Sequence, residues 1–447
     1  MVIQRYPIIM PFRRLLAFLL LFGSWPAAAQ RQPVVPVPLT DSLVRYFLAR
    51  AMTFQNFEGL PLVERQRFAA WAGKAGTRFA GRVAVFWEEP TSPVREQATF
   101  DTLRYIVARL HQVQSGLVVQ GTVYEVLSAH AGTLIVPNAV RAEFGEDTLA
   151  VSRRTYRFAD MMYPGYFDDA PNSYRWDSRP PGQAPGTPDM SQTETQLWFY
   201  SRARRQIDAG CEALHFGQVM LMDDRDPGHR AWWSMLQRVR AYARTRNRGF
   251  VLCDAHTHGE YYDPDPQHPL PDSARQLLFD FHACPIRPAE LDTLFNGPHG
   301  ARLVQDFGSG QTGSIIGRSK GGVAPGGWRV KHQVALIELD NFGAADRVGR
   351  PGQWPWVWGR DEISWFATQP SAYRDQWLVY ATAYLPQLDP NVYLEMPGIR
   401  GVTDPPHPDW HYRADLAGQA EVIPAIWAGK TQKWEEQMRL IGPVKPF

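Results

Sequence analysis

Acidic and histidine side chains recur at the ends of short apolar runs, in a pattern that could do chemistry. The run 250–256 ends in Asp254 and His256, and the run 334–340 ends with Glu338 and Asp340. Residues two apart on a strand point to the same face, so each pair reaches one side of its strand. Two carboxylates that face one cleft can serve as general acid and as base or nucleophile.

The same pattern supplies a wider set of groups that could orient a polar substrate. A solvated surface would not confine its charges to strand ends, although we expect some of these groups to be structural. The candidate substrate-binding residues are Glu88, Glu125, His215, Gln218, His256, Asp280, His282, Asp340 and Glu395.

Aromatic residues add a second signal. Trp354 and Trp356 lie in the Pro-flanked stretch 353–358, which follows one of the apolar runs. Aromatic rings stack on the apolar faces of sugar rings, and they also fill loops by simple packing. We predict that these two residues bind substrate, with loop packing as the alternative.

The elements that must position these residues alternate between short apolar runs and amphipathic helices, which is typical of parallel βα units. The seven predicted strands are 82–87, 117–124, 213–218, 250–256, 277–282, 334–340 and 391–395. An eighth is expected between 285 and 331, with 313–316 as its candidate. The fold class is therefore α/β, a (β/α)₈ TIM barrel. A doubly wound open sheet is the alternative, but no Gly-rich phosphate loop follows the first strand.

Three regions are expected along the chain. Arg13 and Arg14, an apolar run over 15–22 and Ala27-Ala28-Ala29 have the three parts of a cleaved signal peptide, assigned to 1–29. A helical lead-in is expected over 30–80 and the barrel domain over 81–447. The Pro/Gly-rich stretch 125–193 reads as a long insertion after the second strand, and such segments are usually functional. The protein is thus predicted to be secreted or periplasmic.

Composition excludes several classes of partner. The 47 basic and 45 acidic residues give a net charge of +2, whereas nucleic-acid-binding proteins usually have a marked excess of basic residues. No segment after the signal peptide is apolar enough to span a membrane. The three cysteines, Cys211, Cys253 and Cys284, lie in or beside apolar runs and are expected to be buried, although a bridge between the last two stays open.

At the level of architecture, the chain over 82–428 resembles secreted TIM-barrel glycoside hydrolases. In many of these enzymes two carboxylates stand at the ends of the fourth and seventh strands, as acid/base and nucleophile. If the unassigned strand is the sixth, Asp254 (or Glu260) and Glu338 fall at those places. The usual Asn-Glu of the fourth strand is replaced here by 254–258, Asp-Ala-His-Thr-His, which favours inversion of configuration over retention.

The leading hypothesis is an exported enzyme that hydrolyses glycosidic bonds of an oligo- or polysaccharide without a cofactor. Asp254 would be the acid, and Glu338 the base or nucleophile. A second hypothesis is metal-dependent, because His256 and His258 resemble the His-x-His pair of amidohydrolase barrels. That pair lies on the first strand in those enzymes, whereas at least three strands precede it here. A third hypothesis is a barrel that binds a glycan without cleaving it.

Overall fold

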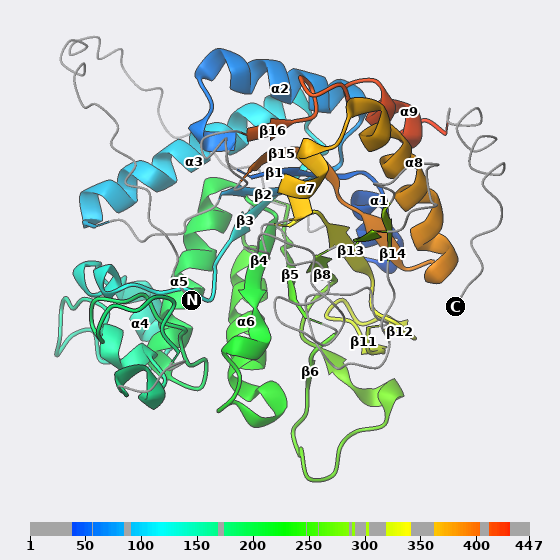
Figure 1. Ribbon diagram of the computed structural model, residues 1–447. Helices are drawn as coiled ribbons and strands as arrows, with labels where there is room; N and C mark the ends of the chain where they lie inside the picture. Colours follow the sequence, from blue (N-terminus) through cyan, green and yellow to red (C-terminus); the bar gives the residue numbers. More distant parts are fainter. Residues whose placement is uncertain are drawn as a thin grey trace, which may run out of the picture.

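The computed structural model of the chain describes residues 38–55, 57–84, 91–168, 174–246, 248–257, 259–285, 288–290, 301–303, 319–340, 362–402 and 411–429. Helices surround a curled sheet in this part of the chain (Figure 1). The predicted signal peptide and the strand candidate 313–316 lie outside the described residues.

The sheet is a parallel barrel. Its strands follow one another in sequence order, each hydrogen-bonded to the next in parallel, from β1 to β14. The strands are β1 (Ala51–Phe54), β2 (Phe79–Ala84), β3 (Val118–Thr122), β4 (Ala213–Gln218), β5 (Leu252–His256), β8 (His282–Pro285), β13 (Ala335–Glu338) and β14 (Val392–Leu394).

The barrel closes through its last strand. Only Glu395 separates β14 from β15 (Met396–Gly401), and β15 pairs in parallel with β1. One continuous strand therefore pairs with β13 through its first half and with β1 through its second half. This closure gives eight parallel strands and confirms the predicted (β/α)₈ barrel.

Helices follow most strands and cover the outside of the barrel (Figure 1). Local signals place their ends: Ser92 caps one helix through the backbone N–H of Arg95, and Gly76 and Gly210 end two others with positive φ. The helices are α1 (Asp41–Leu48), α2 (Leu62–Ala75), α3 (Pro93–Val113), α4 (Asn138–Glu143), α5 (Thr193–Ala209), α6 (Arg230–Ala243), α7 (Glu362–Thr368), α8 (Ser371–Leu388) and α9 (Val422–Trp427). Within the described part of the chain, none of them is long and apolar enough to cross a bilayer.

The remaining strands lie outside the parallel barrel. β16 (His411–Arg413) pairs antiparallel with β15. Two small sheets are formed by β6 (Tyr261–Tyr262), β7 (Gln276–Leu277), β11 (Gly322–Val323) and β12 (Arg329–Val330), and by β9 (Pro288–Glu290) with β10 (Ala301–Leu303). The long segment between β3 and α5 contains α4 and short 3₁₀ turns, and it follows the third barrel strand rather than the second.

The strand count differs from the prediction at its start. The predicted lead-in 30–80 contains α1 and α2 but also β1, a full member of the barrel. β1 was missed because its four residues, Ala51–Phe54, stand between two helices and are too short for a strand pattern to emerge. The barrel reaches eight strands without the candidate at 313–316, and Asp254 lies on its fifth strand rather than its fourth.

The predicted strand 277–282 is also displaced. β7 ends at Leu277 and the barrel strand β8 begins at His282. The apolar residues between these two strands are buried in two different places. Leu278 and Phe279 pack outside the barrel, among residues of α5 and α6, whereas Phe281 packs in the barrel interior. Apolar content alone could not separate these roles.

The interior of the barrel is apolar at the amino ends of the strands. One buried cluster contains a residue from each of six strands and the residue just before β8, together with residues of α1, and such a set can meet only inside the barrel. The strand residues are Ala51, Phe79, Val118, Ala213, Leu252 and Leu336, and Phe281 directly precedes β8. The three cysteines, Cys211, Cys253 and Cys284, are buried and free, so the possible bridge is not formed.

Candidate functional site

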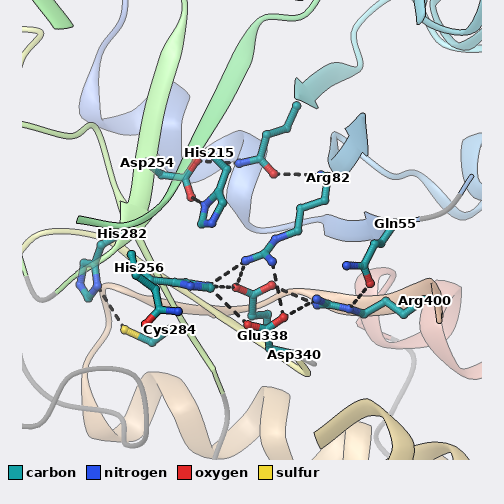
Figure 2. A network of polar contacts seen from close by, with 12 residues as sticks. Gln55, Arg82, His215, Asp254, His256, His282, Cys284, Glu338, Asp340 and Arg400 are labelled. Atoms are coloured by element: carbon teal, nitrogen blue, oxygen red, sulfur yellow. Dashed lines mark hydrogen bonds and ion pairs between the residues drawn. The ribbon is translucent and has the colours of Figure 1, made fainter. Parts of the chain in front are cut away.

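A network of buried charges lies at the carboxyl ends of the strands (Figure 2). Glu338 and Asp340 come from the end of β13, and both are held by two arginines, Arg82 of β2 and Arg400 of β15. Arg82 Nη1 lies 3.5 Å from Asp340 Oδ1, and Arg400 Nη1 lies 3.1 Å from Glu338 Oε2. His256 of β5 completes the network, with its Nε2 2.7 Å from Glu338 Oε1.

Strand β2 reaches this network through an irregularity. Its pairing with β3 shifts register between Ala80 and Ala84, and Arg82 has a φ of 56°. A non-glycine residue in this left-handed region costs free energy, and such residues cluster at functional sites. The irregularity turns Arg82 towards Glu338 on the far side of the barrel, and its backbone N–H donates to Gln120 Oε1 at 2.9 Å.

Glu338 is held as a carboxylate. Burial favours the neutral acid, but the Arg82 guanidinium outweighs it, and the hydrogen bond with His256 acts in the same direction, so that the pKa of Glu338 falls to about 2. His256 Nε2 also lies 2.8 Å from Arg82 Nη2, and a guanidinium nitrogen cannot accept a hydrogen bond. His256 Nε2 therefore either accepts from Arg82 or donates to Glu338 Oε1, and the tautomer of the ring decides which; Glu338 Oε1 also accepts from Arg82.

Asp254 lies one layer deeper in the barrel, in contact with Gln120 and His215. Its Oδ1 accepts from Gln120 Nε2 at 2.6 Å, and its Oδ2 lies 2.8 Å from His215 Nδ1. Burial raises the pKa of Asp254 well above its ordinary value and, with the Arg82 charge, lowers the pKa of His215 well below its own. Both shifts favour the uncharged forms of the two groups.

Glu395 lies between β14 and β15 and points into the barrel. A Cβ atom on Gly81 of β2 would come within 1.8 Å of Glu395 Oε1, so only glycine leaves room for this side chain. Burial and the nearby charge of Glu338 raise the pKa of Glu395 to about 8. The pKa values of three carboxyl groups at the carboxyl end of one barrel are thus shifted in opposite directions: that of Glu338 is lowered, and those of Asp254 and Glu395 are raised.

Glu125 and Gln218 form a pair at the ends of β3 and β4. Glu125 Oε2 accepts from the backbone N–H of Gln218 at 3.1 Å, and Oε1 accepts from Gln218 Nε2 at 3.1 Å. Gly217, with a φ of 61°, makes room, because a Cβ there would lie 1.8 Å from Glu125 Oε2. This pair ties two neighbouring strand ends together.

The structure brings most predicted site residues together, but not all. Asp280 accepts from Arg240 of α6 at 3.1 Å and from the backbone N–H of Cys253 at 2.9 Å, which links a helix to the outside of the barrel. His282 lies beside Cys284, with its Nδ1 3.4 Å from Cys284 Sγ. The predicted site residues Glu88, His258, Trp354 and Trp356 lie outside the described residues.

Sequence reasoning missed the cationic half of the site. Arg82 and Arg400 were not selected because arginines are common on surfaces, whereas here they are almost completely buried. Arg400 also donates through Nε to Gln55 Oε1 at 2.9 Å. A lone arginine at the start of an apolar strand, as in 82–86, is the signal that could have indicated a buried ion pair.

Three donor groups in this network are close enough to hold a metal. Ligand atoms of His256, Glu338 and Asp340 all lie within 4.8 Å of one another. However, both carboxylates already face the guanidiniums of Arg82 and Arg400, which supply positive charge where a cation would bind. The distances between the three ligand atoms would thus allow a metal ion to bind, but the positive charges of the two arginines oppose it.

No protein-family model and no curated protein matches the chain. Solved structures with similar folds include an α-galactosidase from Thermus thermophilus, with 12% identity, 46% of this chain and 38% of that chain covered, and a TM-score of 0.28. The glycoside hydrolase domain of PelA from Pseudomonas aeruginosa matches with 11% identity, coverage of 52% and 68%, and a TM-score of 0.27. An isomalto-dextranase from Arthrobacter globiformis matches with 9% identity, coverage of 79% and 53%, and a TM-score of 0.35.

The chain thus spans about two fifths of the length of the matched α-galactosidase. These structures belong to the enzyme class that the sequence resemblance names, the TIM-barrel glycoside hydrolases. At TM-scores this low the likeness carries no argument about the chemistry of this chain, which has to come from the site.

Proposed function

We propose that the protein is a carbohydrate hydrolase that cleaves glycosidic bonds with paired carboxyl groups. The observation that carries the proposal is the opposite tuning of two inward-facing carboxyl groups, Glu338 and Asp254. The pKa of Glu338 is lowered to about 2 by Arg82 against the effect of burial, whereas burial raises that of Asp254. Groups whose environments separate their pKa values in this way are suited to act as base and acid.

In this proposal Glu338 is the ionised partner, and it activates a water molecule or attacks the sugar directly. Asp254 is the store of the proton that the departing sugar requires. Its assignment no longer depends on a position at the fourth strand, because Asp254 lies on the fifth; it depends on burial and on the hydrogen bonds from Gln120 and to His215.

The surrounding polar groups would orient sugar hydroxyls. Asp340, His256 and the Glu125–Gln218 pair lie at or near the same carboxyl end of the barrel as Glu338. Glu395 sits beside Glu338, and the pKa of Glu395, raised to about 8 by burial and by the charge of Glu338, would let it donate a hydrogen bond at neutral pH. Stacking of a sugar on Trp354 and Trp356 stays a prediction.

The test is a screen of 4-nitrophenyl glycosides and unmodified oligosaccharides with purified protein. On any substrate cleaved, Glu338→Gln and Asp254→Asn should each lower kcat by at least about 10²-fold, the usual contribution of a general acid or base. Asp265→Asn is the control, since that carboxylate is exposed and lies outside the network. Full activity in both site variants would rule out this assignment.

The screen also addresses binding without catalysis. A glycan that binds but is not cleaved, with binding lost in Trp356→Ala, would establish the non-catalytic alternative. Proton NMR of the first product formed would give the anomeric outcome, for which we expect inversion.

We also propose that the protein is exported, as the signal-peptide pattern predicts. Protein recovered from the periplasm or medium of the producing cell should have an N-terminus near Gln30. Mass spectrometry that finds Met1 or Met10 at the terminus of the exported protein would contradict cleavage.

A further inference from the structure

Hydrogen bonds fix the orientation of the groups around Asp254. The backbone N–H of Arg82 can only donate, so Gln120 presents Oε1 to it and its amide nitrogen to Asp254. Asp254 Oδ1 is therefore an acceptor. Any proton on this carboxyl group must lie on Oδ2, the oxygen that is 2.8 Å from His215 Nδ1.

The proton on Asp254, which burial favours, sets the tautomer of His215. A neutral Asp254 donates its Oδ2 proton to Nδ1, so the single proton of the neutral imidazole must lie on Nε2. Both oxygens of Asp254 already have partners, one in Gln120 and the other in His215, whereas Nε2 of His215 has none among the described residues. The Asp254 proton can therefore leave through the imidazole.

The second ring nitrogen of His215, Nε2, is buried without a hydrogen-bond partner among the described residues. His215 as a whole is completely buried. Buried polar atoms are nearly always paired, so an unpaired one points to a group that binds there. The His215 ring lies edge-on against His256, with ring centroids 4.7 Å apart, and His256 contacts Glu338 (Figure 2).

We infer that His215 is a catalytic residue, and that Asp254 acts through it: Nε2 of His215 donates the proton to the glycosidic oxygen as the bond to the sugar breaks. This inference rests on the proposed hydrolase function and names a residue that the paired-carboxylate model does not include. Asp254 then becomes the positioning residue and proton store behind His215.

The proton transfers balance. The Nε2 proton of His215 moves to the glycosidic oxygen, which leaves with the bonding electron pair as an alcohol. The Oδ2 proton of Asp254 moves to Nδ1, so the imidazole stays neutral and Asp254 becomes a carboxylate. Glu338 takes a proton from the water that attacks the sugar carbon. After the products leave, solvent returns that proton to the Asp254–His215 pair.

The first experiment needs no substrate. Nitrogen-15 NMR of the uniformly labelled protein near pH 7, with the His215 signals assigned by comparison with His215→Gln, should show a neutral ring with its proton on Nε2. Asp254→Asn should keep that tautomer, because the amide can donate to Nδ1 while its oxygen accepts from Gln120. A proton on Nδ1, or on both nitrogens, in the wild-type protein would overturn the inference.

The second experiment uses a substrate found in the screen, in an unactivated form and as its 2,4-dinitrophenyl glycoside. Protonation matters only for a poor leaving group. His215→Gln and Asp254→Asn should therefore lower kcat by about 10²–10⁴-fold on the unactivated substrate and far less on the activated one. An equal loss on both substrates, in variants that circular dichroism shows to be folded, would assign His215 a structural role and leave the hydrolase proposal standing.

His268→Asn provides the control for a histidine substitution, since His268 is exposed and pairs with Asp265 away from the barrel interior. Failure to find any cleaved glycoside would count against the proposed function. The NMR result would then decide the proton arrangement alone.

Discussion

The two ends of the barrel interior are built from the same strands and differ completely in chemistry. At the amino end, Leu252 of β5 and Leu336 of β13 lie in an apolar cluster closed by α1. Two residues further along the same inward faces come Asp254 and Glu338, which belong to the polar network. One step of side-chain alternation separates a hydrophobic core from a buried ionic site.

This difference separates stability from function within one fold. Barrel enzymes place their chemistry at the carboxyl end and their packing at the amino end. Buried charges are costly unless they are paired, and the carboxyl end contains two carboxylates and two guanidiniums that neutralise one another. Such a costly arrangement would contribute little to stability over an apolar layer, which argues that it is retained for what it binds.

The largest effect is expected from Glu338→Gln, which disrupts the polar end. Activity should fall by at least about 10²-fold. The free energy of unfolding should fall by about 3–5 kcal/mol, because Arg82 and Arg400 lose a buried charged partner. Urea denaturation and kcat on the same preparation measure both, and a variant with unchanged kcat would contradict the functional role of this end.

Leu336→Ala is the matched change at the apolar end, on the same strand and face. It should lower the free energy of unfolding by about 2–5 kcal/mol through lost burial and a cavity. The kcat of the folded fraction should stay at the wild-type value, because Leu336 supplies no polar group to the network. A large loss of kcat without unfolding would show that the two ends are coupled.

The sequence predicted this division in part. Alternation on strands placed Asp254 with His256 and Glu338 with Asp340 correctly on shared faces, since local pattern determines side-chain direction. It could not place β1, whose strand character comes only from pairing with β2 and β15. Asp280 is a second case that the sequence pattern could not resolve. A carboxylate at the end of an apolar run gives the same pattern whether its partner is a substrate or, as here, Arg240 of a helix.

The arginines could not be found from spacing, for a related reason. Arg82 enters the site through an irregular backbone with a φ of 56°, and this conformation depends on the neighbouring strand. Arg400 lies beyond the predicted end of the last strand, on the half that pairs with β1. Each therefore depends on contacts between residues that are far apart in the sequence.

A smaller effect, on pH dependence, would sharpen the comparison. Burial and the charge of Glu338 raise the pKa of Glu395 from an ordinary 4.5 to about 8. A group whose pKa is raised on folding stabilises the protein fully below its unfolded pKa, and that stabilisation is lost as pH rises through the folded pKa. The free energy of unfolding should therefore fall between about pH 4.5 and pH 8, by up to about 1.4 kcal/mol per pH unit for this group.

Glu395→Gln should remove that share of the slope. Leu336→Ala should instead lower the free energy of unfolding by the same amount at every pH and leave the slope unchanged. Asp254 contributes a slope of the same sign, because burial raises its pKa as well, so some decline should persist in Glu395→Gln. Urea denaturation at pH 5, 6, 7 and 8 measures the slope. An unchanged slope in Glu395→Gln would mean that this carboxyl group does not take up a proton on folding.

The smallest effect is expected from removing metals, because the guanidiniums already supply the positive charge at the polar end. A divalent ion bound by His256, Glu338 and Asp340 would sit close to Arg82 Nη1 and Arg400 Nη1, which lie 3.5 Å from Asp340 and 3.1 Å from Glu338. Repulsion at these distances in a buried site would oppose binding. Elemental analysis of protein purified without chelator should therefore find Zn, Mn and Ni below one ion per chain, and dialysis against EDTA should leave kcat unchanged. One tightly bound ion per chain that is lost in His256→Ala would instead make the polar end a metal centre, and the arginines its outer partners.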